Sequence, residues 1–180
     1  MNKTISRWML PMAVLLGFSP LSVGETFTTF DVPNAIYTYA DAINASGQII
    51  GFYVDSTNVH GFLRQADGSF VVVDPPGANG TIAIAINGPG QISGYYEDAS
   101  SVLHSFLRQP DGTYVTIDPP SSDGTIVGAM NDAGQIVGFF QHITLHYHYG
   151  KNVGYSRGAD GAFVNFHVGT SDNTYAYGVN

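Results

Sequence analysis

Three histidines lie close together in one short segment, and they are the first candidates for chemistry. His142, His146 and His148 stand in the stretch QHITLHYHYGKN, and in a strand the last two would point to the same side. Imidazole is a common ligand of Zn²⁺ and Cu²⁺, so the segment is a candidate metal site. No carboxylate stands between these histidines, and no further ligand follows at a fixed spacing. The alternative interpretation is that they are solvated loop residues stacked among neighbouring tyrosines.

A second group of polar residues recurs at equivalent positions along the chain. A catalytic site requires one copy of each group, whereas a repeated structural unit requires one in every copy. We therefore expect structural roles: asparagines that form tight turns, histidines that bond backbone groups, and aspartates that cap the following turn. Calcium at the repeated acidic turns is the alternative for the aspartates. The residues are Asn44, Asn87, Asn131, His60, His104, Asp74 and Asp118.

Groups for covalent or hydrolytic chemistry are missing from the sequence. The chain has no cysteine and no G-x-S-x-G motif, which would place a nucleophilic serine on a sharp turn. A glycosidase needs two carboxylates facing each other in a cleft, and the acidic residues here fall mostly at repeated turns. We therefore predict that the chain is not an enzyme and uses no cofactor.

The recurring positions belong to a repeat of about 43 residues. An aspartate, or a histidine in the last copy, is followed by a threonine after seven residues and by an asparagine after six more. This 13-residue step occurs four times without insertion or deletion. The length varies only between the G-Q-I-x-G motif and the His-x-Phe position, so one loop in each repeat is free to vary. The aligned segments are 42–76, 85–120 and 129–169.

Each repeat is predicted to form four short antiparallel strands joined by tight turns. The first carries small residues at alternate positions, the second is apolar on both faces, and the fourth has one partly polar face. The first hairpin turns through Asn-x-x-Gly and the second through Asp-Gly, because these residues tolerate the backbone angles that short turns require. In the second copy the strands are expected at 81–87, 91–96, 104–108 and 114–118.

Four antiparallel strands in about 43 residues is typical of a β-propeller blade, and a β-helix is the alternative. In such a blade the variable loop and the crossover to the next repeat share one face, where we would look for binding. The all-β array is expected to be open or incomplete, since three whole repeats are flanked by single strands. The repeats are about 36–76, 79–120 and 123–169, and the flanking strands are 26–31, of the fourth type, and 172–180, of the first type.

Residues 1–24 are typical of a secretory signal peptide, which leaves 25–180 as the repeat domain. Lys3 and Arg7 precede an apolar run that is about half the length needed to span a bilayer, although an uncleaved anchor is the alternative. Removing the leader leaves four basic residues against 14 acidic ones, a net charge of −10. We expect a secreted or cell-surface protein that binds no nucleic acid and has no membrane span after cleavage.

The repeat resembles the HAF-repeat family, named for a His-Ala-Phe signature and regarded as extracellular. The signature stands here as His60-Gly61-Phe62 and His104-Ser105-Phe106, and as Val153-Gly154-Tyr155 in the third copy. The resemblance covers about residues 26–180 and includes G-Q-I-x-G, D-G and D-x-P. It implies an extracellular location and a repeat architecture, and no chemistry.

Two functions remain for such a chain. The first is a non-catalytic structural or adhesive role, and the alternative is a glycan-binding, lectin-like propeller that uses the variable-loop face. The partners would be an extracellular glycan or protein, or further copies of the chain joined through open blade edges.

Overall fold

A computed structural model describes residues 27–142, 151–168 and 173–180. The chain divides into two compact units, Met1–Phe30 and Asp31–Asn180. Only residues 27–30 of the first unit are described, and they form neither helix nor strand. The predicted signal peptide, His146 and His148 lie outside the described residues.

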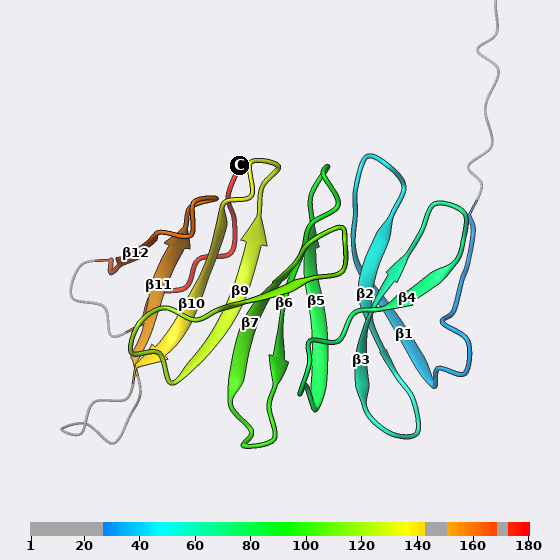
Figure 1. Ribbon diagram of the computed structural model, residues 1–180, viewed down its shortest axis with the longest axis horizontal. Helices are drawn as coiled ribbons and strands as arrows, with labels where there is room; N and C mark the ends of the chain where they lie inside the picture. Colours follow the sequence, from blue (N-terminus) through cyan, green and yellow to red (C-terminus); the bar gives the residue numbers. More distant parts are fainter. Residues whose placement is uncertain (1–26, 143–150, 169–172) are drawn as a thin grey trace, which may run out of the picture. The chain divides into compact units, whose positions relative to one another are not determined.

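The second unit contains three four-stranded antiparallel sheets, and its described residues form no helix (Figure 1). The first sheet consists of β1 (Tyr37–Ile43), β2 (Ile49–Val54), β3 (Val59–Arg64) and β4 (Phe70–Val72). The second consists of β5 (Gly80–Ile86), β6 (Ile92–Glu97), β7 (Leu103–Arg108) and β8 (Tyr114–Ile117). The third consists of β9 (Gly124–Met130), β10 (Ile136–His142), β11 (Lys151–Arg157) and β12 (Phe163–Phe166).

The strands of each sheet follow one another in chain order, so every repeat is one sheet of three successive hairpins. This confirms the prediction of three four-stranded antiparallel repeats. The predicted turns are also present: Gly90 in Asn-x-x-Gly and Gly112 in Asp-Gly have φ of 87° and 91°, which a residue with a side chain rarely adopts.

The predicted strands at the two ends are wrong for the described residues. Residues 27–31 form no strand, and residues 173–180 form only a single parallel bridge between Asn152 and Asn173. A strand needs a neighbour that supplies a continuous ladder of hydrogen bonds. The C-terminal segment 173–180 instead lies flat against the third sheet: Thr174 packs at Gly154, and the carbonyl of Ala176 lies directly against Gly128.

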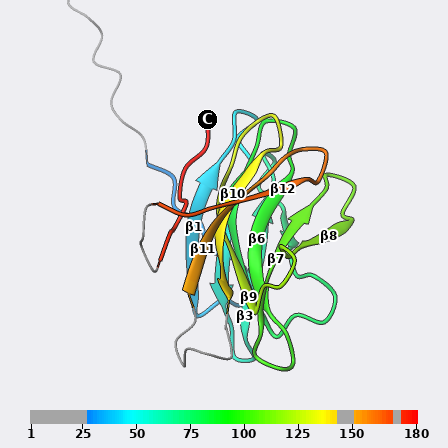
Figure 2. The same ribbon diagram turned by 90° about the vertical axis from the view of Figure 1, so that its left-hand side faces the viewer.

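The hydrophobic core lies between successive sheets rather than within one sheet. β5 packs on β2 and β3, and β9 packs on β6 and β7, so the first strand of the second and third sheets covers the preceding sheet (Figure 1). Figure 2 looks along this stack, so that the sheets lie one behind another. This explains the small residues that recur on the first strand, since Ala83 is fully buried. The first core cluster is Ile50, Leu63, Val73, Ala83, Ile92 and Phe106; the second is Leu107, Ile117, Val127, Met130, Ile136, Phe140, Val153 and Tyr155.

Candidate functional site

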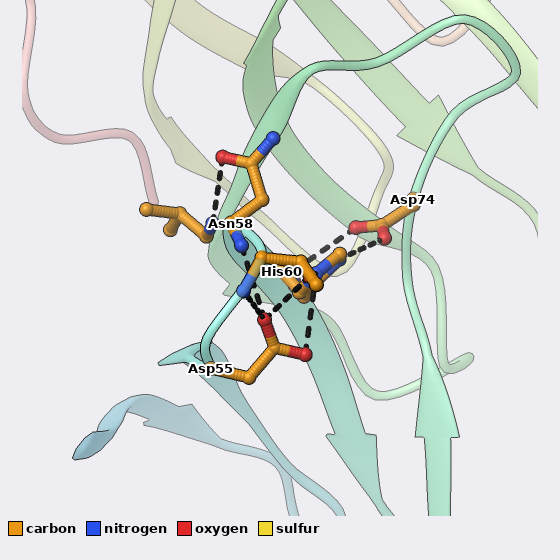
Figure 3. Close-up of polar contacts among 7 residues, drawn as sticks. Asp55, Asn58, His60 and Asp74 are labelled. Carbon is orange, nitrogen blue, oxygen red and sulfur yellow. Dashed lines mark hydrogen bonds and ion pairs between the residues drawn. The ribbon is translucent and has the colours of Figure 1, made fainter. Parts of the chain in front are cut away.

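A histidine held between two carboxylates is the most chemically distinctive feature of the first sheet (Figure 3). His60 Nδ1 lies 2.7 Å from Asp74 Oδ2, and His60 Nε2 lies 3.7 Å from Asp55 Oδ2. The imidazole also stacks on Tyr53, its direct partner on β2, with the ring centroids 5.2 Å apart. We call this arrangement an Asp–His–Asp clamp: the histidine lies between one aspartate of the variable loop, here Asp55, and one aspartate of the crossover, here Asp74.

The second sheet repeats the clamp with equivalent residues. His104 Nδ1 lies 2.7 Å from Asp118 Oδ2, and His104 Nε2 lies 3.4 Å from Asp98 Oδ2. Tyr96 again lies beside the imidazole, with the ring centroids 5.3 Å apart. Burial acts to lower the pKa of His104, but the hydrogen bonds and negative charges of Asp118 and then Asp98 outweigh it and raise that pKa above its usual value.

The clamp positions carry other residues in the third sheet. Val153 stands at the histidine position, and His167 stands where Asp74 and Asp118 stand in the other copies. Each clamp joins the third strand of a sheet to its variable loop and to the crossover that follows the fourth strand. In the first clamp the Thr57 hydroxyl also lies 3.4 Å from His60 Nε2, and it donates a hydrogen bond to Asp55 Oδ1 at 2.6 Å.

Two details of the clamp differ from the expectation from sequence. The histidines bond carboxylates rather than backbone groups, because the crossover folds back beside β3 and β7. Asp74 therefore bonds His60 and the Gly61 amide instead of capping the next turn. Asp55 and Asp98 were not predicted as site residues; they precede their histidines by five and six residues in the variable loop. Their common signal is that each follows the second strand of its sheet.

The repeated asparagines form the predicted turns and also connect one repeat to the next. Asn87 Oδ1 accepts a hydrogen bond from the Gln91 amide at 2.8 Å, which closes its turn. The Nδ2 groups of Asn44, Asn87 and Asn131 each donate to the backbone carbonyl of the next asparagine, at 3.1, 3.4 and 3.1 Å. This asparagine ladder runs from Asn44 to Asn180.

The histidine segment gives no metal centre within the described part of the chain. His142, the only one of its three histidines that is described, has Nδ1 2.8 Å from the Ser121 carbonyl oxygen. Among residues 27–142, 151–168 and 173–180, no group of three or more His, Cys, Asp or Glu side chains is placed to hold a metal ion. The metal and calcium sites stay predictions. The same ranges include no helix long and apolar enough to cross a bilayer.

Two clefts occupy equivalent positions between successive sheets, at the end that carries the variable loops. The smaller cleft has a volume of about 140 Å³, and the larger one has about 330 Å³. Each of the six residues that line the smaller cleft has an equivalent in the next repeat, and all six equivalents line the larger cleft. In the smaller cleft these are Val59, Gly80, Ile82, Tyr95, Glu97 and Leu103; in the larger they are Leu103, Gly124, Ile126, Phe139, Gln141 and Asn152.

Comparison of the chain with protein-family models, with curated proteins and with solved structures gives no match. The resemblance to the HAF-repeat family stays a prediction from the residues quoted above.

Proposed function

We propose that this chain is a secreted or cell-surface β-repeat protein with a structural or adhesive role and no catalytic activity. The observation that carries the proposal is that the recurring polar side chains of the chain bond other parts of the repeat array. His60 and His104 make the same contacts in successive sheets, and the ladder asparagines join each repeat to the next. Groups that could have served catalysis are thus engaged in holding the array together.

We also propose that the three sheets are blades of a propeller-like array. The supporting observation is that each sheet stacks on its predecessor through its first strand, as blades do. The C-terminal segment 173–180 packs on the third sheet through a residue equivalent to one that β5 uses on the first sheet. Thr174 packs at Gly154 as Thr81 packs at Gly61. A propeller-like ring would be completed by strands from further repeats or from another copy.

The exposed surface supports an interaction role. β1 lies at the edge of its sheet and exposes Tyr37, Tyr39 and Ile43, by 59%, 50% and 65%. Large apolar side chains on a strand that has a neighbour on only one side among the described residues favour association with another chain or with a ligand. The net charge of −8 disfavours nucleic acids and anionic membrane surfaces. An extracellular glycan or protein, or self-association, remains as the partner.

Substitution of the clamp histidines tests the non-catalytic role. His60→Asn and His104→Asn are expected to lower Tm by about 2–4 °C each, since each removes about 1 kcal/mol of clamp contacts. Binding of the secreted protein to immobilised extracellular-matrix proteins and glycans should stay unchanged. Turnover of a glycoside, ester or peptide substrate that His104→Asn abolishes without changing Tm would contradict the proposal.

Secretion is tested separately on the full chain. Expression of residues 1–180 with a C-terminal tag should place the protein in the medium or on the cell surface, with its N-terminus at Glu25. Retention inside the cell with residues 1–24 intact would contradict the proposed location.

A further inference from the structure

The larger cleft differs from the smaller one in the chemistry of its walls. Leu103 and Glu97 of the smaller cleft are replaced by Asn152 and Gln141 in the larger. An apolar side chain has thus become an amide, and a carboxylate has become a neutral amide. Both clefts result from the stacking of one sheet on the next, but the amide-rich lining occurs only in the larger cleft, between the second and third sheets.

An aromatic platform completes the larger cleft. Tyr175 belongs to the segment that lies on the third sheet, and 46% of its surface is exposed. The Phe139 ring meets it edge-on, with the ring centroids 4.7 Å apart, and Asn152 Nδ2 donates to its hydroxyl oxygen at 2.9 Å. These contacts fix the ring before any ligand arrives, which lowers the entropic cost of binding.

Hydrogen-bonding groups surround the platform. Gln141 and Ser101 are exposed, and their side chains have no hydrogen-bond partner among the described residues. An amide offers both donors and an acceptor, and a hydroxyl offers one donor and two lone pairs. Asp123, directly before β9, adds a carboxylate to the cleft wall, and its backbone amide donates to the Gln141 carbonyl at 2.8 Å.

From these observations we infer that the larger cleft binds a neutral sugar residue of an extracellular glycan. A pyranose ring has an apolar face of C–H groups, which suits the exposed surface of the Tyr175 ring, and an edge of hydroxyls, which suits Gln141 and Ser101. The volume of about 330 Å³ lies at the lower end of the roughly 300–1,000 Å³ usual for small-molecule sites. This inference rests on the proposed interaction role and names the partner.

Charge selects between classes of sugar. Asp123 lies in the cleft and the chain carries a net charge of −8, so uronic acids, sialic acids and sulfated sugars would be repelled. The replacement of Glu97 by Gln141 at the equivalent position removes one carboxylate and leaves an amide that bonds hydroxyls in either direction. A ligand that presents uncharged hydroxyls therefore fits the lining best.

The test is a printed array of neutral, acidic and amine-bearing glycans, probed with the full secreted protein. Calorimetry with the methyl glycoside of the strongest neutral hit then measures affinity. Tyr175→Ala should weaken binding by about tenfold, because the stacking platform is lost. Tyr175→Phe, which keeps the ring, should stay within about threefold of wild type.

Matched variants come from the two equivalent clefts. Gln141→Ala should weaken binding by about tenfold, whereas Glu97→Ala, at the same position of the smaller cleft, should leave it unchanged. Thermal unfolding of each variant confirms that the fold is intact. A flat array, hits confined to amine-bearing or acidic glycans, or equal binding by Tyr175→Ala and wild type would overturn the inference. A flat array together with retained binding to extracellular proteins would leave the proposed adhesive role standing.

Discussion

At the scale of single residues, the two clamps differ in the distance between the loop aspartate and the Nε2 atom of the histidine. Both have a crossover aspartate at 2.7 Å from Nδ1. The loop aspartate lies at 3.7 Å from His60 Nε2 but at 3.4 Å from His104 Nε2, because the variable loop is one residue longer in the second repeat. The shorter contact gives His104 a carboxylate within hydrogen-bonding reach of each ring nitrogen, which favours the imidazolium form.

The raised pKa of His104 predicts a specific pH dependence of stability. A histidine whose pKa is higher in the folded state stabilises fully below its unfolded value of about 6.5, and this contribution is lost as the pH rises through the folded pKa. The difference in Tm between wild type and His104→Asn should therefore be largest near pH 6 and shrink toward pH 9. Thermal unfolding at several pH values measures this difference.

The control for this prediction is His142→Asn. His142 contacts the Ser121 carbonyl and no carboxylate among the described residues, so its removal should give a difference in Tm that does not shrink in the same way. A difference for His104→Asn that stays constant from pH 6 to pH 9 would show that the clamp contributes by packing alone.

A second prediction concerns the threonine that follows each crossover. In the first copy the Val32 amide donates to Thr38 Oγ1 at 3.1 Å, but the equivalent donor in the next copy is Pro75, which has no N–H. Thr81 Oγ1 is consequently buried without a hydrogen-bond partner among the described residues. Thr81→Val should raise the free energy of unfolding by about 1 kcal/mol, because it removes an unpaired buried hydroxyl and keeps the methyl group.

Thr38→Val is the matched control, since it leaves the Val32 amide without its acceptor. We expect it to lower the free energy of unfolding by about 1 kcal/mol. Urea denaturation of both variants gives the two signs. A loss of similar size in both would mean that Thr81 finds a partner in solution, such as a bound water.

At the scale of strands, a bulge in the first strand of each sheet explains the last glycine of G-Q-I-x-G. The pairing register shifts between Ala40 and Ala42 in the first sheet and between Ala83 and Ala85 in the second. The extra residue bends the strand and brings its backbone close to the second strand. A Cβ at Gly94 would lie only 2.2 Å from the Ile82 carbonyl oxygen.

Gly94→Ala should therefore destabilise the protein by about 1–3 kcal/mol, because the backbone of β5 must move. Gly80→Ala, in β5, is the control: its Cβ would meet Asn58 Oδ1 at 3.6 Å, an ordinary contact, so this substitution should be nearly neutral. Chemical denaturation compares the two. Equal stabilities would show that the second sheet accommodates a methyl group at this point.

The strands themselves follow from local signals in the sequence, whereas the sites depend on contacts that no local signal contains. Alternating apolar residues and the Asn-x-x-Gly and Asp-Gly turns were sufficient to predict three four-stranded sheets. The end strands were predicted from the same motif, but a strand also needs a partner, and segment 173–180 has a single bridge. The larger cleft was not foreseen beyond the choice of its face, because Ser101, Asn152 and Tyr175 come from three separate parts of the chain and meet only after the sheets have stacked.

At the scale of the whole molecule, stability is divided among sheets that each contact their neighbours. Arrays of this kind gain much of their stability from the interfaces between adjacent repeats. Two kinds of contact make these interfaces: the apolar clusters between sheets, and the asparagine ladder at the ends of the first strands. The apolar contacts are non-directional. Each ladder bond, in contrast, joins one defined amide to one defined carbonyl and so fixes the register of neighbouring sheets.

The ladder predicts that equivalent asparagines contribute unequally, according to their burial. Asn87 is 2% exposed, and Asn87→Ala would leave the Gln91 amide without its acceptor, although the Asn131 carbonyl would keep its hydrogen bond from the Gly134 amide. A loss of about 2 kcal/mol is expected, because a buried polar group without its partner costs roughly 1–3 kcal/mol. Asn131 makes the same bonds at an exposed position, where water can replace the side chain, so Asn131→Ala should cost less than about 1 kcal/mol. Asn87→Ala should also broaden the urea transition, because it weakens the coupling between the second and third sheets. Equal losses in both variants, with unchanged slopes, would mean that the asparagines act only as turn formers and that the apolar clusters alone hold the sheets in register.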